Sequence, residues 1–150
     1  QDPSTGFFYV YRTYLGGKSP TDRVEDWQAS SRGERIVRRV GGNYNETDSR
    51  DLYTREGWHI TEPRIRRVLP QVEAVNQLHK NNQVYAFSDM HEYLDEKLTF
   101  SWEVDKEDQV VPKIHNESQY HLMACERYLL SDLRPVRAAT SNKIPILSWG

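Results

Sequence analysis

The stretch from His91 to Glu96, HEYLDE, carries side chains that could bind a metal or transfer a proton. A zinc-binding helix that opens with His-Glu needs a second His four residues after the first, and Asp95 stands there instead. His91, Glu92 and Asp95 would share one helix face, which is more typical of a solvated face than of a metal site. The five histidines form no close pair in the sequence. A His–carboxylate pair would therefore have to join distant segments.

Two further catalytic motifs are incomplete. The sequence GGKS at Gly16 to Ser19 matches the last residues of a phosphate-binding loop, but Arg12 occupies the place of the required earlier Gly, so no such loop is expected. No G-x-S-x-G sequence is present to hold a nucleophilic serine. Cys125 lies within a helical pattern and is interpreted as a small buried residue. The sequence thus indicates no catalytic residue, no cofactor and no metal site, and it favours a protein that is not an enzyme.

The charge distribution is the most informative feature of the sequence. Residues 32–67 hold nine arginines and six acidic residues, whereas residues 71–133 hold twelve acidic and five basic residues. The whole chain has a net charge of −2 and favours Arg over Lys. A guanidinium group pairs with a carboxylate or a phosphate through two parallel hydrogen bonds. The candidate binding residues are the arginines and aromatic residues of this basic segment: Arg35, Arg38, Arg39, Arg64, Arg66, Arg67, Tyr44, Tyr53 and Trp58.

Three interpretations of the basic segment follow. Its arginines could pair with the acidic segment of their own domain, contact an acidic protein, or bind a nucleic acid. We expect a non-catalytic binding domain, a subunit of a larger assembly, that contacts an acidic partner through the arginine-rich surface. One alternative is binding of RNA or single-stranded DNA, with the tyrosines stacking on bases. The other is a small hydrolase or transferase that uses a His–carboxylate pair.

The composition limits the possible environments of the protein. No apolar run approaches the roughly 20 residues that span a bilayer, so membrane insertion is not expected. A single cysteine favours an intracellular protein. Two N-glycosylation sequences, at Asn45 and Asn116, are weak evidence for secretion.

The first half of the chain predicts a strand followed by a helix. Phe7 to Leu15 is aromatic and β-branched with both faces apolar, which predicts an inner strand. Ser19 to Asp22 has the residues of a helix start, with Ser as N-cap and Pro in the first turn. The composition of Gly41 to Asp51 predicts a loop, and a short strand is expected around Leu52 to Ile60.

The middle of the chain predicts a long helix. Thr61-Glu62-Pro63 would open it, and apolar residues recur at helical spacing from Ile65 to Leu78. Pro70 within this pattern predicts a kink near Leu69. Arg64 and Arg67 would lie on one face of this helix.

The last third predicts two short strands, a helix and a final strand. Leu98 to Val104 and Gln109 to Ile114 read as a hairpin with an acidic turn. Asn116 would cap a helix that runs to about Leu133, and Lys143 to Trp149 reads as a strand or an extended tail.

These elements predict an α+β fold, because strands and helices mix without a regular βαβ order. We expect one domain over residues 7–150, with a small, mainly antiparallel sheet packed against two or three helices. Residues 1–6 are interpreted as an artificial or freshly trimmed end without structure.

Overall fold

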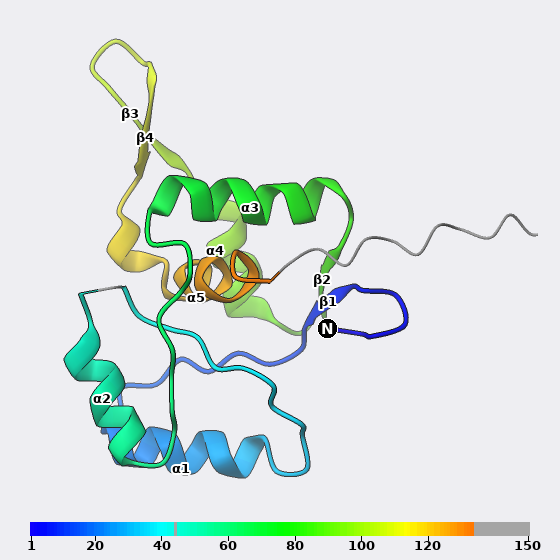
Figure 1. Ribbon diagram of the computed structural model, residues 1–150. Coiled ribbons are helices and arrows are strands. Elements are labelled where there is room, and N and C mark those ends of the chain that lie inside the picture. The colour runs from blue at the N-terminus through cyan, green and yellow to red at the C-terminus, as the bar shows by residue number, and fades with distance from the viewer. Residues whose placement is uncertain (44, 134–150) are drawn as a thin grey trace, which may run out of the picture.

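The computed structural model describes residues 1–43 and 45–133, and it confirms the α+β class. Five α-helices lie in this part of the chain, more than the two or three expected. No helix in the described ranges has the length and apolar character needed to cross a membrane. The elements in chain order (Figure 1) are β1 (Phe8–Val10), α1 (Pro20–Ser30), α2 (Thr47–Arg55), α3 (Val68–Lys80), β2 (Val84–Ala86), α4 (His91–Thr99), β3 (Trp102–Val104), β4 (Val110–Ile114), the 3-10 helix η1 (Glu117–Gln119) and α5 (His121–Leu130).

The strands form two separate pairs. β3 and β4 make the predicted antiparallel hairpin, which projects from the helices in Figure 1. β1 pairs in parallel with β2, and Phe8 lies opposite Val84. Within the described residues β1 has this one neighbour, so the prediction of an inner strand was wrong. The chain leaves the strand after Val10, and the Tyr11 and Tyr14 hydroxyls then donate to carboxylates of later segments, Glu34 at 2.9 Å and Asp26 at 2.7 Å.

Short-range hydrogen bonds hold residues 1–6 and the start of helix α1. The Asp2 N–H donates to the Phe7 carbonyl at 2.8 Å, so residues 1–6 form a closed turn. Helix α1 begins as predicted, since the Ser19 hydroxyl accepts from the Asp22 N–H at 3.2 Å. Pro20 occupies the first turn, where its missing N–H costs no hydrogen bond.

Helix α2 replaces the loop and the strand expected between residues 41 and 60. Its sequence carries Asp48 in the first turn and Arg55 in the last, which suits the helix dipole at both ends. Its residues are all exposed or half-buried, and Leu52 remains 42% exposed. The helix lacked an apolar stripe in the sequence, so periodicity could not detect it.

Helix α3 starts later than predicted. It begins at Val68 and Pro70 lies in its first turn, so the proline does not kink the helix. Arg67 is the N-cap residue and Arg64 lies before the helix, so the expected shared helix face does not exist. The buried stripe of Val72, Val75 and Leu78 is confirmed.

The core lies where α3, α4 and α5 meet, and α3 crosses α5 in Figure 1. Met123 and Ile114 have their side chains fully buried there. A second cluster joins β1 to the far ends of α3 and α5 through Phe8, Val75, Leu78 and Leu130. Helices α1 and α2 pack on each other outside this core.

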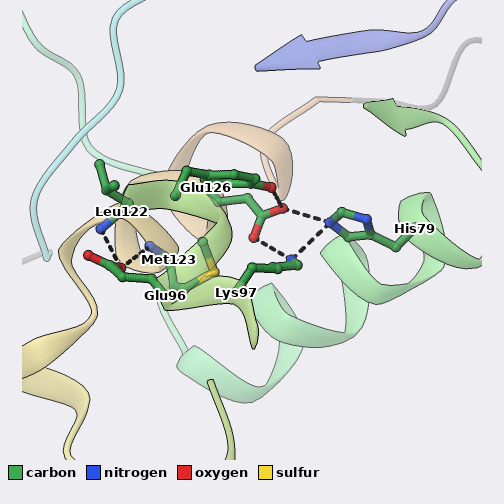
Figure 2. A network of polar contacts seen from close by, with 7 residues as sticks. His79, Glu96, Lys97, Leu122, Met123 and Glu126 are labelled. Carbon is green, nitrogen blue, oxygen red and sulfur yellow. Dashed lines mark hydrogen bonds and ion pairs between the residues drawn. The ribbon is translucent and has the colours of Figure 1, made fainter. Parts of the chain in front are cut away.

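The start of α5 is determined by a residue from another helix. The Glu96 carboxylate of α4 accepts from the Leu122 N–H at 2.9 Å and the Met123 N–H at 3.0 Å (Figure 2). This cap places the α-helical start at His121, after η1, rather than at Asn116. The predicted strand at Lys143 to Trp149 lies outside the described residues.

Candidate functional site: an aromatic groove

The described part of the chain contains an apolar groove of about 480 Å³. One wall is the continuous segment from Phe8 to Tyr14, and the other is α5. Cys125 and Leu129 of α5 line it, and Leu129 is 41% exposed. Pockets of this size and character are typical of sites that bind apolar ligands or peptide segments.

Aromatic side chains build one end of the groove. The ring centroid of Trp27 in α1 lies 5.7 Å from Trp58 and 6.1 Å from Tyr14, and all three side chains line the groove. Tyr53 packs behind Trp27 at 5.3 Å, and its hydroxyl accepts from the Arg23 guanidinium at 3.0 Å. The structure thus brings together Tyr53 and Trp58, two of the predicted binding residues, through their shared contact with Trp27. Their rings pack against side chains of the same chain.

The groove wall includes an unpaired strand edge. The Phe8 N–H donates to the Gln83 carbonyl, and the Val10 carbonyl accepts from the Phe87 N–H. The backbone groups of Phe8 and Val10 therefore face β2. The backbone groups of Tyr9, between them, point away from β2, because successive residues of a strand bond to opposite sides. They make no hydrogen bond to the residues that the structure describes. An edge of this kind can pair with a further strand.

Cys125 lies exposed on the groove surface, so the interpretation of a small buried residue was wrong. The protein atoms around its thiol displace part of its water and raise its pKa, and the nearby Glu96 carboxylate raises the pKa further. The neutral thiol therefore dominates at neutral pH, which disfavours a nucleophilic role.

Glu126 also lines the groove, and its carboxylate is the centre of a buried polar network (Figure 2). The Tyr93 hydroxyl donates to Oε1 at 2.8 Å, and the same oxygen lies 2.7 Å from Nε2 of His79. Lys97 Nζ donates to Oε2 at 2.7 Å. One carboxylate thereby joins α3, α4 and α5.

The electrostatics of this network keep Glu126 ionised. Burial alone would raise its pKa, but the hydrogen bond to His79 and the charge of Lys97 outweigh burial and lower the pKa. The Tyr93 hydroxyl is held neutral, because burial and the Glu126 charge raise its pKa. His79 Nε2 also lies 2.9 Å from Lys97 Nζ, and one ring nitrogen cannot donate to the carboxylate and accept from the ammonium at once.

The sequence did not identify this network. His79 was one of five unpaired histidines, and no sequence motif pointed to Glu126. A signal was present: Glu126 falls four residues after Leu122 and four before Leu130, within the buried stripe of α5. A carboxylate in that place must find a partner, because an unpaired buried charge is costly.

The structure gives three of the six predicted arginines an ion pair with a described residue of the same chain. Arg38 pairs with Asp132, whose side chain has no exposed surface. The Arg64 side chain lies 3.5 Å from Asp132, and its backbone N–H donates to the same carboxylate at 3.2 Å. Arg66 pairs with Glu62 at 2.9 Å on the surface.

The remaining predicted residues differ in their surroundings. The Arg39 guanidinium lies 3.9 Å from the centroid of the Trp58 ring, a cation–π contact. Arg35 and Arg67 are exposed, with no ion pair to any residue in the described ranges. Tyr44 lies outside the described residues.

A second hollow of about 330 Å³ adjoins the groove at Ile36, which lines both. Arg38, Arg39 and His59 contribute to its walls, and the neighbouring Val37 is 82% exposed. Basic and apolar side chains therefore occur together beside the groove. In the described ranges, no three His, Cys, Asp or Glu side chains are grouped so that they could hold a metal ion.

Comparison with known proteins gives this chain no relative from which a function could be transferred: no family model, no curated protein and no solved structure matches it.

Proposed function

We propose that this protein is a non-catalytic binding domain, a subunit of a larger assembly, that contacts an extended segment of an acidic protein partner. The observation that supports this most is the groove, because it combines an apolar lining with an unpaired strand edge. A segment added to such an edge gains main-chain hydrogen bonds, and the apolar walls accept its side chains.

The arginines beside the groove favour an acidic partner. Arg35 and Arg39 flank Ile36 and Val37, which are 38% and 82% exposed. Exposed aliphatic side chains between cations suit a partner segment that alternates apolar and acidic residues. Such charges chiefly increase the rate of association and the selection of partners.

The enzyme alternative would depend on His79 and Glu126. That pair joins distant segments, as the sequence required, and its carboxylate lines the groove. Three donors already engage the carboxylate, and its lowered pKa makes it a poor base at neutral pH. The arrangement is better suited to holding three helices together.

The proposal is tested by the affinity of a labelled ten-residue peptide of alternating Glu and Leu, measured by fluorescence anisotropy. We expect the variant Arg35→Glu, which reverses the charge beside the groove residue Ile36, to bind the peptide about tenfold more weakly than the unaltered protein, a loss of about 1.4 kcal/mol. Arg35 is exposed, so the fold is retained. Lys106→Glu, an exposed change in the hairpin turn, is the control and should leave the affinity unchanged.

Two outcomes would contradict the proposal. One is the absence of peptide binding up to about 1 mM, which corresponds to only about 4 kcal/mol of binding free energy. The other is binding of a ten-nucleotide RNA in preference to the peptide, with an affinity that falls steeply with salt. That result would support the nucleic-acid alternative.

A further inference from the structure

The hollow of about 330 Å³ beside the groove, called the basic hollow below, is lined by Ile36, Val37, Arg38, Arg39, His59 and Thr61. Three of these six side chains are basic and none is acidic. Ile36 also lines the groove, so a segment in the groove can place a side chain in the basic hollow. The Thr61 N–H donates to the Arg39 carbonyl at 3.0 Å, so the two chain segments that form the walls are already joined before a ligand binds.

Arg39 has hydrogen-bond donors available for a ligand. Its guanidinium lies 3.9 Å from the centroid of the Trp58 ring, and this cation–π contact holds the group without using any of its N–H donors. The side chain makes no hydrogen bond or ion pair to the residues that the structure describes. Within those residues Nε is its one buried nitrogen without a partner, so the two Nη groups remain accessible to an acceptor.

The cations around the basic hollow outnumber their counter-charge. The buried carboxylate of Asp132 contacts both Arg38 and Arg64. One negative charge therefore serves two guanidinium groups, and Arg39 adds a third cation. The Arg38 side chain is 26% exposed, so it can contact a ligand in the hollow while it keeps Asp132. A local excess of positive charge in a recess attracts anions.

A phosphorylated side chain suits these donors better than a carboxylate does. A carboxylate carries one charge and two acceptor oxygens, whereas a phosphorylated serine carries a charge of about −1.5 to −2 and three acceptor oxygens. Two adjacent arginines, with His59 on the other chain segment, can donate to separate oxygens of one phosphate. Arginine clusters are a recurring means of recognising phosphorylated peptides.

The surroundings favour a peptide rather than a nucleic acid as the carrier of the phosphate. Single-stranded nucleic acids are held by aromatic rings that stack on their bases. The rings of Tyr53 and Trp58 pack on Trp27, and Arg39 covers Trp58. Val37 lines the hollow and is 82% exposed, and its aliphatic side chain suits contact with an apolar residue of a peptide.

We propose that the basic hollow binds the phosphate of a phosphorylated serine or threonine in the segment that the groove holds. This inference rests on the proposed function and specifies the partner, because the phosphorylated residue belongs to the same acidic segment. Arg38, Arg39 and His59 donate to the phosphate oxygens, and Ile36 connects the hollow to the groove.

The test uses the labelled Glu-Leu peptide with phosphoserine in place of one glutamate at a time. Fluorescence anisotropy gives the affinity of each peptide for the unaltered protein and its variants. We expect a phosphoserine at one position to increase the affinity about tenfold over the glutamate peptide, and Arg39→Gln to remove this gain. The affinity of Arg39→Gln for the glutamate peptide should change by at most about threefold, which shows that the variant keeps its fold.

Two further variants separate the phosphate contact from an indirect effect. His59→Gln removes a basic group of the hollow on an exposed residue and should reduce the gain about threefold. Arg67→Gln is the matched control, because it removes the same charge as Arg39→Gln from an exposed arginine that does not line the hollow. This control should keep the full gain.

Free O-phosphoserine tests the basic hollow without the groove. Its binding is followed by NMR through the ring signals of His59, which are assigned by their loss in His59→Gln. We expect saturable shifts of these signals in the unaltered protein, no shifts with free serine, and no saturable shifts in Arg39→Gln.

The inference is overturned if phosphoserine gives no gain at any position, or if Arg39→Gln keeps the gain. Tighter binding of the ten-nucleotide RNA than of every phosphopeptide would also overturn it, since the phosphate would then belong to a nucleic acid. The two proposals can fail separately. If the glutamate peptide binds and phosphoserine adds nothing, the proposed function remains and this inference fails. If free phosphoserine shifts the His59 signals while no peptide binds, the phosphate site remains and the proposed function fails.

Discussion

Replacement of Glu126 by Gln is expected to lower the free energy of unfolding by about 3 kcal/mol at neutral pH, a typical loss when one partner of a buried ion pair is removed. The side chain of Glu126 is 4% exposed, and its two oxygens accept from Tyr93 and Lys97 and contact His79. The Gln amide keeps the volume but loses the charge that compensates Lys97. The loss stays below the upper limit for such pairs, because the His79 and Lys97 side chains are each 31% exposed and reach water.

The same variant is expected to change the response to acid. The folded-state pKa of Glu126 is lower than its ordinary value of 4.5, so the unfolded chain binds this proton more readily. The stabilisation by Glu126 is therefore complete above about pH 4.5 and is lost as the pH falls through the lower folded-state pKa. Glu126→Gln lacks this titration, so its stability should decline less steeply with acid in that window.

Chemical denaturation at several pH values measures both effects. Glu103→Gln is the matched control, since Glu103 pairs with Lys113, whose side chain is 71% exposed. An exposed pair contributes at most about 1 kcal/mol, so the control should stay close to the unaltered protein. If Glu126→Gln is as stable as the unaltered protein, or declines with acid in parallel with it, the network does not hold the three helices together.

Replacement of Asp132 by Ala is expected to destabilise the fold by about 3 kcal/mol, because it leaves two guanidinium groups without their buried counter-charge. The Asp132 side chain has no exposed surface and contacts both Arg38 and Arg64. It also accepts the backbone N–H of Arg64 at 3.2 Å, which fixes the chain before α3. These contacts join the end of α5 to two segments that lie more than 65 residues earlier.

A double-mutant cycle assigns this loss to the ion pair. Thermal or chemical unfolding of Arg38→Ala, Asp132→Ala and the double variant gives their coupling energy, which we expect to be about 1 to 3 kcal/mol for a buried pair in direct contact. Glu62→Ala removes the exposed partner of Arg66 and serves as the control, with a change of at most about 1 kcal/mol. A coupling energy near zero would show that Asp132 acts through packing alone.

Asp132 also decides how much of the predicted arginine surface is available. Its one carboxylate pairs with both Arg38 and Arg64, whereas Arg35 and Arg67 are exposed without an ion pair to any residue of the described ranges. The cationic surface that a partner can meet is therefore smaller than the sequence suggested. This difference is the reason that the affinity test uses Arg35, beside the groove, rather than Arg64.

Local sequence determined several elements of this protein correctly. The Ser19 cap of α1, the apolar stripe of α3 and the β3–β4 hairpin were predicted from residues close together in the chain. These features depend on local hydrogen bonds and on side-chain periodicity, which are properties of a short segment in isolation. The same information established the α+β class and the excess of arginine over lysine.

Tertiary structure decided the partners of the charged groups. The Glu96 cap of α5, the pairing of Glu126 with His79 and Lys97, and the choice of Asp132 for Arg38 each join residues more than 20 positions apart. The sequence shows how many charges exist, but the energy of each pair depends on distance and burial, which only the packed chain defines. The aromatic groove is likewise a property of packing, because its two walls come from opposite ends of the described chain.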